Sequence, residues 1–393
     1  MTLRATVIAL ALFAALPAAA ACPADCDGDR SVTVSELVRA VGIAIGDNGL
    51  EVCPAADADG DGNVTVSELV RAVNRALSGC LPDGEDLTVA NLNFLHGLFC
   101  PNETGNCRLA DRTDLLMQWI AGSGCPDLVT LQEIWPMSAP LIRERLPGLC
   151  TFEYQVELAT LPPVQALDSA MILSRYPIEG ATVTFLHPGF RHVLSATIRH
   201  PLGAIRLFVT HLAARSDGAT DPCGEMCPPE CVAAGVVNIR QCQGVQVAGM
   251  AEQARAEGAT VVAAGDFNEE PGSFVYRQFV ERGFTDVYRA AGNPECDGGS
   301  GIGCTSGREV HELTDLESSE SNTDERIDFI FLALAPELAA CRLDGATDED
   351  EDGSATRVFA DLPNPFAERC GPLPDPICWP SDHEGVEMDL DCD

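Results

Sequence analysis

The sequence predicts an α/β domain that follows a small helical module. From residue 87 onwards, short apolar runs typical of strands alternate with segments of helical periodicity, which is the pattern of an α/β domain. Between residues 22 and 82, the segment VTVSELVRAV occurs twice without change, at 32–41 and 64–73. The 393 residues are enough for two domains. We therefore expect four parts: a signal peptide at 1–21, the repeat module at 22–82, a linker at 83–86 and the α/β domain at 87–393.

Residues 1–21 have the features of a secretory signal. Arg4 supplies the positive start, residues 7–16 are apolar, and residues 18–21 are alanines that suit a cleavage site. The apolar run is too short to cross a bilayer, and no later segment is longer, so we expect no transmembrane segment. The protein is therefore predicted to be secreted, periplasmic or extracellular. Lipid anchoring at Cys22, directly after the alanines, is a minor alternative.

The cysteine content agrees with export. Eighteen cysteines fit an oxidising compartment, and we expect most of them to form disulfides whose pairing the sequence does not reveal. Cys223, Cys227, Cys231 and Cys242 do not have the two-residue spacing common in zinc sites, so disulfides are favoured there as well.

The chain is strongly acidic, with a formal net charge of −36, and all its basic residues other than histidine are arginines. This charge argues against tight, non-specific binding of nucleic acid. It does not exclude a nuclease, because a local arginine cluster and bound cations can reverse the field at a site.

The repeat carries oxygen-bearing side chains at the spacing of a twelve-residue calcium loop. The two copies lie 32 residues apart, counted from Asp25 to Asp57. Positions 1, 3, 5, 7, 9 and 12 of such a loop supply the ligands of Ca²⁺, and here they are Asp25, Asp27, Asp29, Ser31, Thr33 and Glu36 in the first copy and Asp57, Asp59, Asp61, Asn63, Thr65 and Glu68 in the second. Position 6 makes a sharp turn that favours glycine. It is Gly62 in the second copy but Arg30 in the first, so the first site should be the weaker one.

Each loop leads into one amphipathic helix, and no helix leads into either loop. A calcium loop with only its exit helix, present twice, resembles dockerin-type modules. That resemblance implies a cohesin-like partner. A calcium-stabilised spacer fits the sequence about equally well, and acidic turns that bind no calcium are a third possibility.

In the second domain, polar side chains stand at the ends of the predicted strands. Residues 260–264 form an apolar run suited to a buried strand, and Gly265, Asp266, Phe267 and Asn268 follow it. Asp266 and Asn268 are two residues apart, so in extended backbone both point to one side. Chemistry in α/β folds gathers at the carboxyl ends of strands. The other strand-like runs lead to the same kinds of residue: Asn91 and Asn93 after 87–90, Glu133 after 128–131, His211 after 205–210, Asp328 within 326–331, and Asp382 and His383 near the C-terminus.

In this order the motifs resemble the endonuclease/exonuclease/phosphatase superfamily, the divalent-metal phosphodiesterases related to pancreatic deoxyribonuclease. The resemblance covers roughly residues 86–393. It implies an α/β (α+β) fold, a four-layer sandwich of two packed mixed β-sheets flanked by helices. It also implies hydrolysis of a phosphate ester by in-line attack of water.

The resemblance implies a metal site as well. Glu133 would be the main metal carboxylate, with Asn91 and Asp382 beside it, while Asn93 takes the second polar place of the first motif. Hard oxygen ligands favour Mg²⁺ or Mn²⁺. Such a metal would neutralise phosphate charge and stabilise the leaving oxygen.

The remaining motif residues are assigned catalytic roles by the same resemblance. His211 would hold a non-bridging phosphate oxygen, and Asp266 would orient or deprotonate the attacking water. Asn268 would donate to the phosphoryl oxygens as charge builds. His383 would complete the site, with Asp328 fixing its tautomer and stabilising the imidazolium.

The chain departs from the superfamily pattern in one motif. Many members carry Thr-Trp between the fourth and fifth motifs, where residues 303–307 here read GCTSG. Residues 170–178 are expected to be scaffold, with Arg175 as a possible phosphate contact. The histidines outside the motifs are predicted to be core or surface residues: His96, His187, His192, His200 and His311.

The substrate stays open at this stage. A nucleic acid or a phospholipid headgroup would both supply a phosphate ester, so a nuclease, a phosphatase and a sphingomyelinase-like phospholipid hydrolase are alternatives. From another class, the chain could be a catalytically inactive calcium-binding scaffold protein.

Overall fold

The computed structural model describes residues 24–29, 31–57, 62–65, 68–69, 72–73, 76, 86–98, 100–101, 104–161, 169–310, 313–345, 355–359, 366, 370 and 376–392. The chain divides into two compact units, one N-terminal up to residue 84 and one spanning residues 85–392. The predicted signal peptide and Cys22 lie outside the described residues, so export stays a prediction. Among the described helices, none has both the length and the apolar character needed to cross a membrane.

The N-terminal unit forms around its repeat. Helix α1 (Val34–Ala44) begins with a capping box, in which Thr33 and Glu36 each bond the backbone N–H of the other, and short 3₁₀ helices follow at η1 (Leu50–Val52) and η2 (Pro54–Ala56). Equivalent residues of the two copies share one buried core. The residues 32 positions apart in that core are Ala24 and Ala56, Val32 and Val64, and Ala40 and Ala72. The sequence repeat is therefore also a repeat in the packing.

The second unit contains two mixed β-sheets. The first has the order β11-β13-β1-β2-β4-β3, with β12 also paired to β13. Its strands are β1 (Leu87–Asn93), β2 (Leu128–Ile134), β3 (Tyr154–Glu157), β4 (Ser169–Ser174), β11 (Arg342–Leu343), β12 (Arg357–Val358) and β13 (Val386–Asp391). The second has the order β5-β6-β7-β8-β10-β9. Its strands are β5 (Ile178–Phe185), β6 (His192–His200), β7 (Gly203–His211), β8 (Thr260–Asp266), β9 (Thr285–Asp286) and β10 (Asp328–Ala333).

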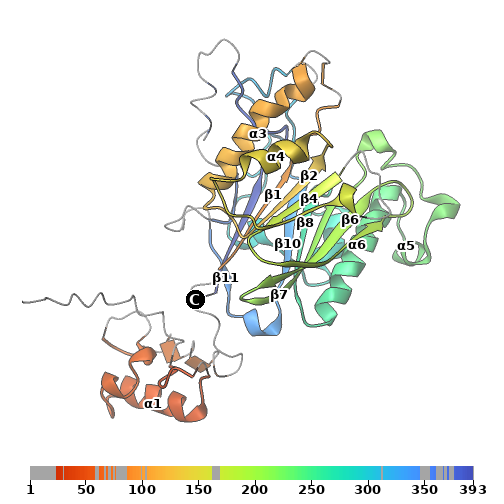
Figure 1. The fold of residues 1–393 in the computed structure, drawn as a ribbon. Helices are drawn as coiled ribbons and strands as arrows, with labels where there is room; N and C mark the ends of the chain where they lie inside the picture. Colours follow the sequence, from red (N-terminus) through yellow and green to blue (C-terminus); the bar gives the residue numbers. More distant parts are fainter. Residues whose placement is uncertain are drawn as a thin grey trace, which may run out of the picture. The chain divides into compact units, whose positions relative to one another are not determined.

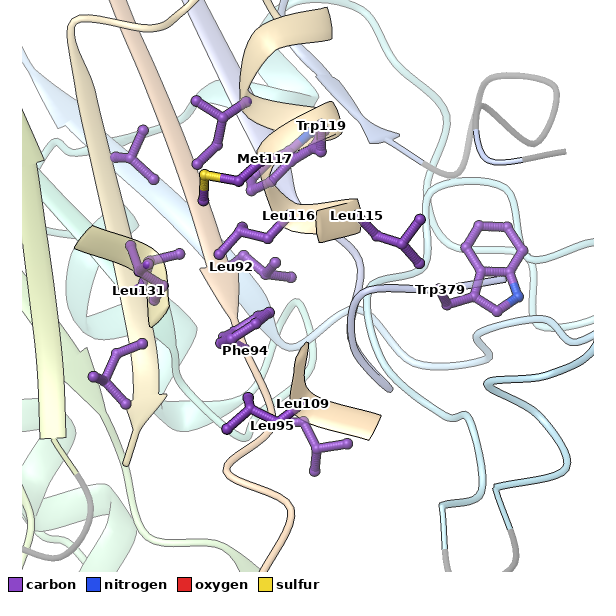
Figure 2. Packing of buried hydrophobic residues seen from close by; sticks show 14 of the residues in the cluster. Leu92, Phe94, Leu95, Leu109, Leu115, Leu116, Met117, Trp119, Leu131 and Trp379 are labelled. Atoms are coloured by element: carbon purple, nitrogen blue, oxygen red, sulfur yellow. The ribbon is translucent and has the colours of Figure 1, made fainter. Parts of the chain in front are cut away.

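Helices cover the outer faces of both sheets, which confirms the predicted four-layer sandwich (Figure 1). Helices α3 (Gly105–Gly122) and α4 (Ser138–Arg145) pack on the first sheet, and α6 (Ile239–Ala256) and α7 (Phe274–Val280) pack on the second. Figure 2 shows Leu92 of β1 next to Leu116 of α3 in the first of these cores. The shorter helices are η4 (Leu158–Thr160), η5 (Arg215–Asp217), η6 (Gly224–Met226), α5 (Pro229–Ala234), α8 (Val287–Ala290) and η7 (Pro336–Leu338).

Strand alternation decides which side chains face the interior between the sheets. In β1, Ala90 and Leu92 pack under α3, so Asn91 and Asn93 point to the other face. In β8, Val261 and Ala263 pack under α6, so Asp266 points toward the first sheet. The same parity applies to β2, β7 and β10, and it sends Gln132, His211 and Asp328 into the same layer.

The strand register brings three of these residues into one row. His211 of β7 is the pairing partner of Asp266 of β8, and Asp266 is in turn the partner of Asp328 at the start of β10. Strands β7 and β8 are parallel while β10 is antiparallel to them, so two strand ends and one strand start meet at the same edge of the sheet.

Every cysteine among the described residues is paired, which confirms the disulfide prediction for this part of the chain. Cys223 pairs with Cys227 and Cys231 with Cys242, so these four cysteines form disulfides instead of a zinc site in this structure. The other pairs are 26–53, 100–107, 125–150, 296–304, 341–392 and 370–378.

Gly265 is the residue that lets β7 and β8 approach each other at the site edge. Its φ is +152°, and a Cβ at this position would lie 1.9 Å from the carbonyl oxygen of Thr210. We expect Gly265→Ala to lower the free energy of unfolding by about 1–3 kcal/mol or more, because the backbone of one strand must shift. Gly249 in α6 has no atom within 4 Å of such a Cβ. Gly249→Ala is the matched control, expected to be neutral or up to about 1 kcal/mol more stable. Urea unfolding without reductant measures both, and equal stabilities would contradict this interpretation.

Candidate active site

Asn93 joins the two sheets at the centre of the site. Its Nδ2 donates to Oε1 of Glu133 at 3.1 Å and to Oδ2 of Asp266 at 3.0 Å, and it lies 3.5 Å from Nε2 of His383. Asn93 is 1% exposed and Asp266 is 2% exposed. One carboxamide therefore contacts a side chain of its own sheet, one of the opposite sheet and one of the C-terminal loop.

Glu133 reaches the site through an irregular strand end. Regular alternation would place it on the helix-covered face with Leu131, but the pairing of β2 with β4 shifts register between Leu131 and Ile134. Glu133 has a left-handed backbone with φ of 56°, which is costly for this residue type and is typical of functional sites. Its Oε2 accepts the backbone N–H of His96 at 3.0 Å, and the ring Nδ1 of His96 lies 3.5 Å away.

The turn after β8 fixes Asp266. Oδ1 of Asp266 accepts the backbone N–H of Asn268 at 2.8 Å, while Oδ2 lies 3.3 Å from Nε2 of His211. Asn268 takes a left-handed φ of 53°, which asparagine tolerates better than most residues. Its Nδ2 donates to the carbonyl of Leu212 at 3.1 Å, which ties the turn to the end of β7. One amide hydrogen of Asn268 is thus committed to this bond, and the second can serve another acceptor.

His383 and Asp328 form a buried pair. Nδ1 of His383 lies 2.8 Å from Oδ2 of Asp328, and Nε2 lies 3.9 Å from Oδ2 of Asp266. Burial alone lowers the pKa of His383, but the Asp328 carboxylate and its hydrogen bond outweigh it and hold this pKa well above its usual value. Burial also raises the pKa of Asp328 to about 6. The pair therefore favours an imidazolium whose Nδ1 proton is held by Asp328.

Asp382 lies on the side of the site where Glu133 stands. Ser381 Oγ donates to the carbonyl of Asn93 at 2.6 Å and lies 3.1 Å from Oδ1 of Asp382, which places the C-terminal loop beside β1. Burial raises the pKa of Asp382, and the negative charge of Glu133 adds to this effect. Two carboxylates next to an amide form a set of hard oxygen ligands that suits Mg²⁺ or Mn²⁺.

Arg112 of α3 connects the segment after β1 to the loop that carries Asp382. Its guanidinium is fully buried and donates only to backbone carbonyls, with distances from 2.6 to 3.1 Å. The acceptors are Phe94, Leu95, Asn106, Cys107 and Pro380, so each of its five N–H groups has a partner. Phe94 and Leu95 directly follow Asn93, and Pro380 directly precedes Ser381. One side chain thus fixes the end of β1 and the loop that carries Asp382 and His383.

Asn91 lies on the same face of β1 as Asn93 but two residues before the strand end, and its role as a metal ligand stays a prediction. Its Oδ1 accepts hydrogen bonds from Thr130 Oγ1 at 2.7 Å and from Gln132 Nε2 at 2.8 Å, so both lone pairs are used away from Glu133. The reason is that β1 does not end before Asn91 but continues through Asn93. Asn91 and Asn93 point to the same face, and Asn93 is the one at the strand end. Arg175, considered as a phosphate contact, binds Asp127 instead. These two residues lie at the ends of β2 and β4 that are opposite to Glu133.

The remaining catalytic candidates are brought together as the motifs implied. Glu133, His211, Asp266, Asn268, Asp328, Asp382 and His383 all lie around the layer between the sheets. The sequence analysis assigned His96 to the core or surface, yet it contacts Glu133. Its position three residues after Asn93, in the segment that follows β1, could have indicated this contact. Ser306 was not singled out either, and its Oγ lies 3.4 Å from Nε2 of His383. The sequence carried no signal for Arg112.

The calcium-loop candidates are partly described. Carboxylate oxygens of Asp25, Asp27 and Asp29 all lie within 4.8 Å of one another. Ser31 donates its N–H to Asp29, and Oε2 of Glu36 accepts from both the backbone and the hydroxyl of Thr33. In the second copy, Asp57 accepts the N–H of Gly62, and Glu68 accepts from Thr65 in the same manner as Glu36. Asn63 lies within the described loop, whereas Asp59 and Asp61 lie outside the described residues.

Comparisons with known proteins agree with this fold. The profile of the endonuclease/exonuclease/phosphatase family matches residues 89–383. Among solved structures, the chain is similar to an endonuclease/exonuclease/phosphatase from Bacteroides vulgatus, with 16% identity and a TM-score of 0.52 over 78% of this chain and 99% of that one. A mannosyl-6-phosphatase from Bacteroides thetaiotaomicron gives the same four values. TDP2 from Caenorhabditis elegans is 14% identical, with a TM-score of 0.50 over 98% of this chain and 99% of that one. No curated protein sequence matches the chain.

We expect Arg112→Met to lower the free energy of unfolding by at least about 3 kcal/mol, because it leaves several buried carbonyls without donors. Arg112→Lys keeps the charge but supplies only three donors, so its effect should be intermediate. Arg199, whose side chain is 66% exposed, provides the control, and Arg199→Met should change stability by less than about 0.5 kcal/mol. Urea unfolding monitored by circular dichroism gives all three values. A stability of Arg112→Met equal to that of Arg199→Met would show that the carbonyl contacts are dispensable.

Proposed function

The chain belongs to the endonuclease/exonuclease/phosphatase family, and on that premise we propose that its second unit is a divalent-metal-dependent hydrolase that cleaves a phosphate ester by in-line attack of water. The observation that carries the proposal is the pair of hydrogen bonds from Asn93 to Glu133 and to Asp266, 3.1 and 3.0 Å long. They bring Glu133, the candidate metal ligand of one sheet, next to Asp266, the candidate general base of the other. Hydrolysis of a phosphate ester needs both groups at one point.

Glu133 and Asp382 are the residues that would hold the metal, with the carboxamide of Asn93 beside them. The raised pKa of Asp382, caused by burial and by the charge of Glu133, supports this set, because a divalent cation would relieve the repulsion. When bound, Mg²⁺ or Mn²⁺ supplies charge neutralisation for the phosphate and for its leaving oxygen.

The side chains on the second sheet are suited to proton handling and phosphate binding. Asp266 would orient and deprotonate the attacking water, since its Oδ1 is held by the backbone of Asn268 and its Oδ2 points into the site. His211, with Nε2 3.3 Å from Asp266, would hold a non-bridging phosphate oxygen. Asn268 would offer the second hydrogen of its amide to the same group.

His383 would stabilise the charge that develops on the phosphoryl group. The Asp328 carboxylate 2.8 Å from its Nδ1 keeps the proton there and leaves Nε2–H for the substrate. Because its positive charge is created by a buried neighbour before substrate arrives, little reorganisation is needed in the transition state.

The substrate class needs a broad test. Nucleic acid, sphingomyelin and other phospholipid headgroups were open from the sequence, and one protein of similar fold is a mannosyl-6-phosphatase, so sugar phosphates belong beside the diesters. A panel of DNA, RNA, sphingomyelin, inositol phosphates and mannose 6-phosphate, each with Mg²⁺, covers these alternatives. The inactive-scaffold alternative predicts no turnover of any of them.

On the best substrate of that panel, we expect chelation to abolish turnover. Glu133→Gln should mainly raise the Mg²⁺ concentration required, because it removes a ligand charge. Asp266→Asn and His383→Ala should lower kcat at saturating Mg²⁺ by about 10²-fold or more, because they act on the transition state. Glu252, which is exposed in α6, provides Glu252→Gln as the control with unchanged activity. If Asp266→Asn and His383→Ala leave kcat unchanged, the site is misassigned.

We further propose that the first unit binds Ca²⁺ through its two loops. The convergence of the carboxylates of Asp25, Asp27 and Asp29 supports this for the first loop. Bound Ca²⁺ would also stabilise the unit, since a ligand that binds only the folded form adds to the free energy of unfolding.

Calorimetric titration of the mature chain with Ca²⁺, in excess Mg²⁺ to occupy the second unit, should reveal two sites. Glu36→Gln and Glu68→Gln should each weaken one site by removing the last ligand of one loop. The exposed Glu51 of the same unit provides Glu51→Gln as a control without effect. An absence of heat at millimolar Ca²⁺, or equal effects of all three variants, would refute the proposal.

A further inference from the structure

We propose that Ser306 is a further catalytic residue, whose hydroxyl donates a hydrogen bond to the reacting phosphoryl group. The inference rests on the proposed function of the second unit and adds one residue to it. Ser306 lies in residues 303–307, the segment that departs from the superfamily pattern, and no role was assigned to it from the sequence. The inference comes from the position of Ser306 Oγ, 3.4 Å from Nε2 of His383.

The local sequence suits the backbone conformation of the segment from Gly303 to Gly307. Both glycines have a positive φ, 73° and 140°, and a Cβ at either position would collide with neighbouring atoms. The disulfide between Cys296 and Cys304 fixes the segment from one side. Substitution of either glycine would therefore shift everything between them.

This segment lies between β10, which carries Asp328, and the C-terminal loop, which carries His383. Thr305 Oγ1 accepts the backbone N–H groups of Ile327 and Asp328 at 3.0 and 3.1 Å, and the carbonyl of Thr305 accepts the N–H of Glu384 at 2.7 Å. Ser306 forms antiparallel bridges with both Glu325 and His383. The backbone of Ser306 is thus fixed relative to Asp328 on one side and His383 on the other.

This backbone places the hydroxyl at the centre of the site. Nε2 of His383, next to Ser306 Oγ, also lies 3.5 Å from Nδ2 of Asn93 and 3.9 Å from Oδ2 of Asp266. A phosphoryl group positioned between Asp266 and His383 would therefore lie next to Ser306. Ser306 is half-buried, so the residue is partly shielded from bulk water but not enclosed by protein.

A hydroxyl can accept one hydrogen bond while it donates another. A phosphoryl group beside Nε2 of His383 would also be within reach of Ser306 Oγ, which lies 3.4 Å from that nitrogen. The Ser306 hydroxyl then directs its own hydrogen to a phosphoryl oxygen. Such a donor is fixed before substrate binds, which is the condition under which a single hydrogen bond contributes strongly to a rate.

The test measures kcat and KM of the mature chain on the best panel substrate with saturating Mg²⁺. We expect Ser306→Ala to lower kcat by about 10²-fold with KM nearly unchanged, because the bond is made to the transition state. Ser306→Thr keeps the hydroxyl and should recover most of that loss. The control is Ser300→Ala in the same loop, whose hydroxyl bonds Asp297 and which should leave both constants unchanged. Thermal unfolding of each variant separates misfolding from lost chemistry.

Three results would overturn the inference. One is an unchanged kcat in Ser306→Ala, and another is a change in KM alone, which would indicate ordinary binding. The third is retention of ³²P on Ser306 of the wild-type protein during turnover, which would make the serine a nucleophile instead of a donor. If His383→Ala also has no effect, the proposed function itself has failed. If His383→Ala removes turnover while Ser306→Ala does not, only the Ser306 inference has failed.

Discussion

The buried guanidinium of Arg112 is the interaction on which the arrangement of the second unit depends. It has no carboxylate hydrogen-bond partner and instead satisfies its five N–H groups with backbone carbonyls of three separate segments. Charge-assisted hydrogen bonds of this kind are stronger than neutral ones, and losing them would strand several carbonyls in the core. Burial lowers the pKa of Arg112 to about 10, while Asp382 and Glu133 act in the opposite direction, so the group stays charged at neutral pH. The same charge favours the ionised carboxylate of Asp382.

The two sheets divide the site between them. The first sheet and the loop tied to it by Arg112 supply Asn93, Glu133 and Asp382, the residues suited to a metal. The second supplies His211, Asp266 and Asp328 in one row across three paired strands. His383 lies in the loop that leads into β13 of the first sheet, but its side chain pairs with Asp328 of the second sheet. Catalysis of the proposed kind therefore requires a fixed position of one sheet relative to the other. The hydrogen bonds of Asn93 to Asp266 and of His383 to Asp328 stabilise that position.

Backbone strain is concentrated at two of these residues. Glu133 and Asn268 both adopt a left-handed backbone at strand ends, where the chain leaves regular structure and must still aim a side chain. Asn268 relieves part of the cost by donating its amide to Leu212 and its N–H to Asp266. Glu133 accepts the N–H of His96 in the corresponding way. Hydrogen bonds outside the regular strand ladders thus fix both Glu133 and Asn268.

Much of this arrangement could be predicted from the sequence, because strand-like runs that end in polar residues are local patterns. Those patterns and their order carried the family resemblance, and the resemblance implied the four-layer sandwich and most of the residues around the site. Which of Asn91 and Asn93 stands at the strand end could not be predicted, because both residues share one strand face and only the length of the strand distinguishes them. Arg112 and Ser306 could not be found from local patterns at all. Their roles depend on contacts that only the fold creates, among them those with Pro380 and His383, 268 and 77 residues away in the sequence.

The most direct measurement is the location of Mn²⁺ and phosphate in crystals of the mature protein soaked with both, identified by anomalous diffraction. The account predicts an Mn²⁺ peak bound by Glu133, with Asn93 and Asp382 beside it, and a phosphate between that metal and the histidines His211 and His383. Asp266, Asp328 and His383 also bring ligand atoms within 4.8 Å of one another. An Mn²⁺ ion held by those three residues, or phosphate bound away from both histidines, would contradict the account.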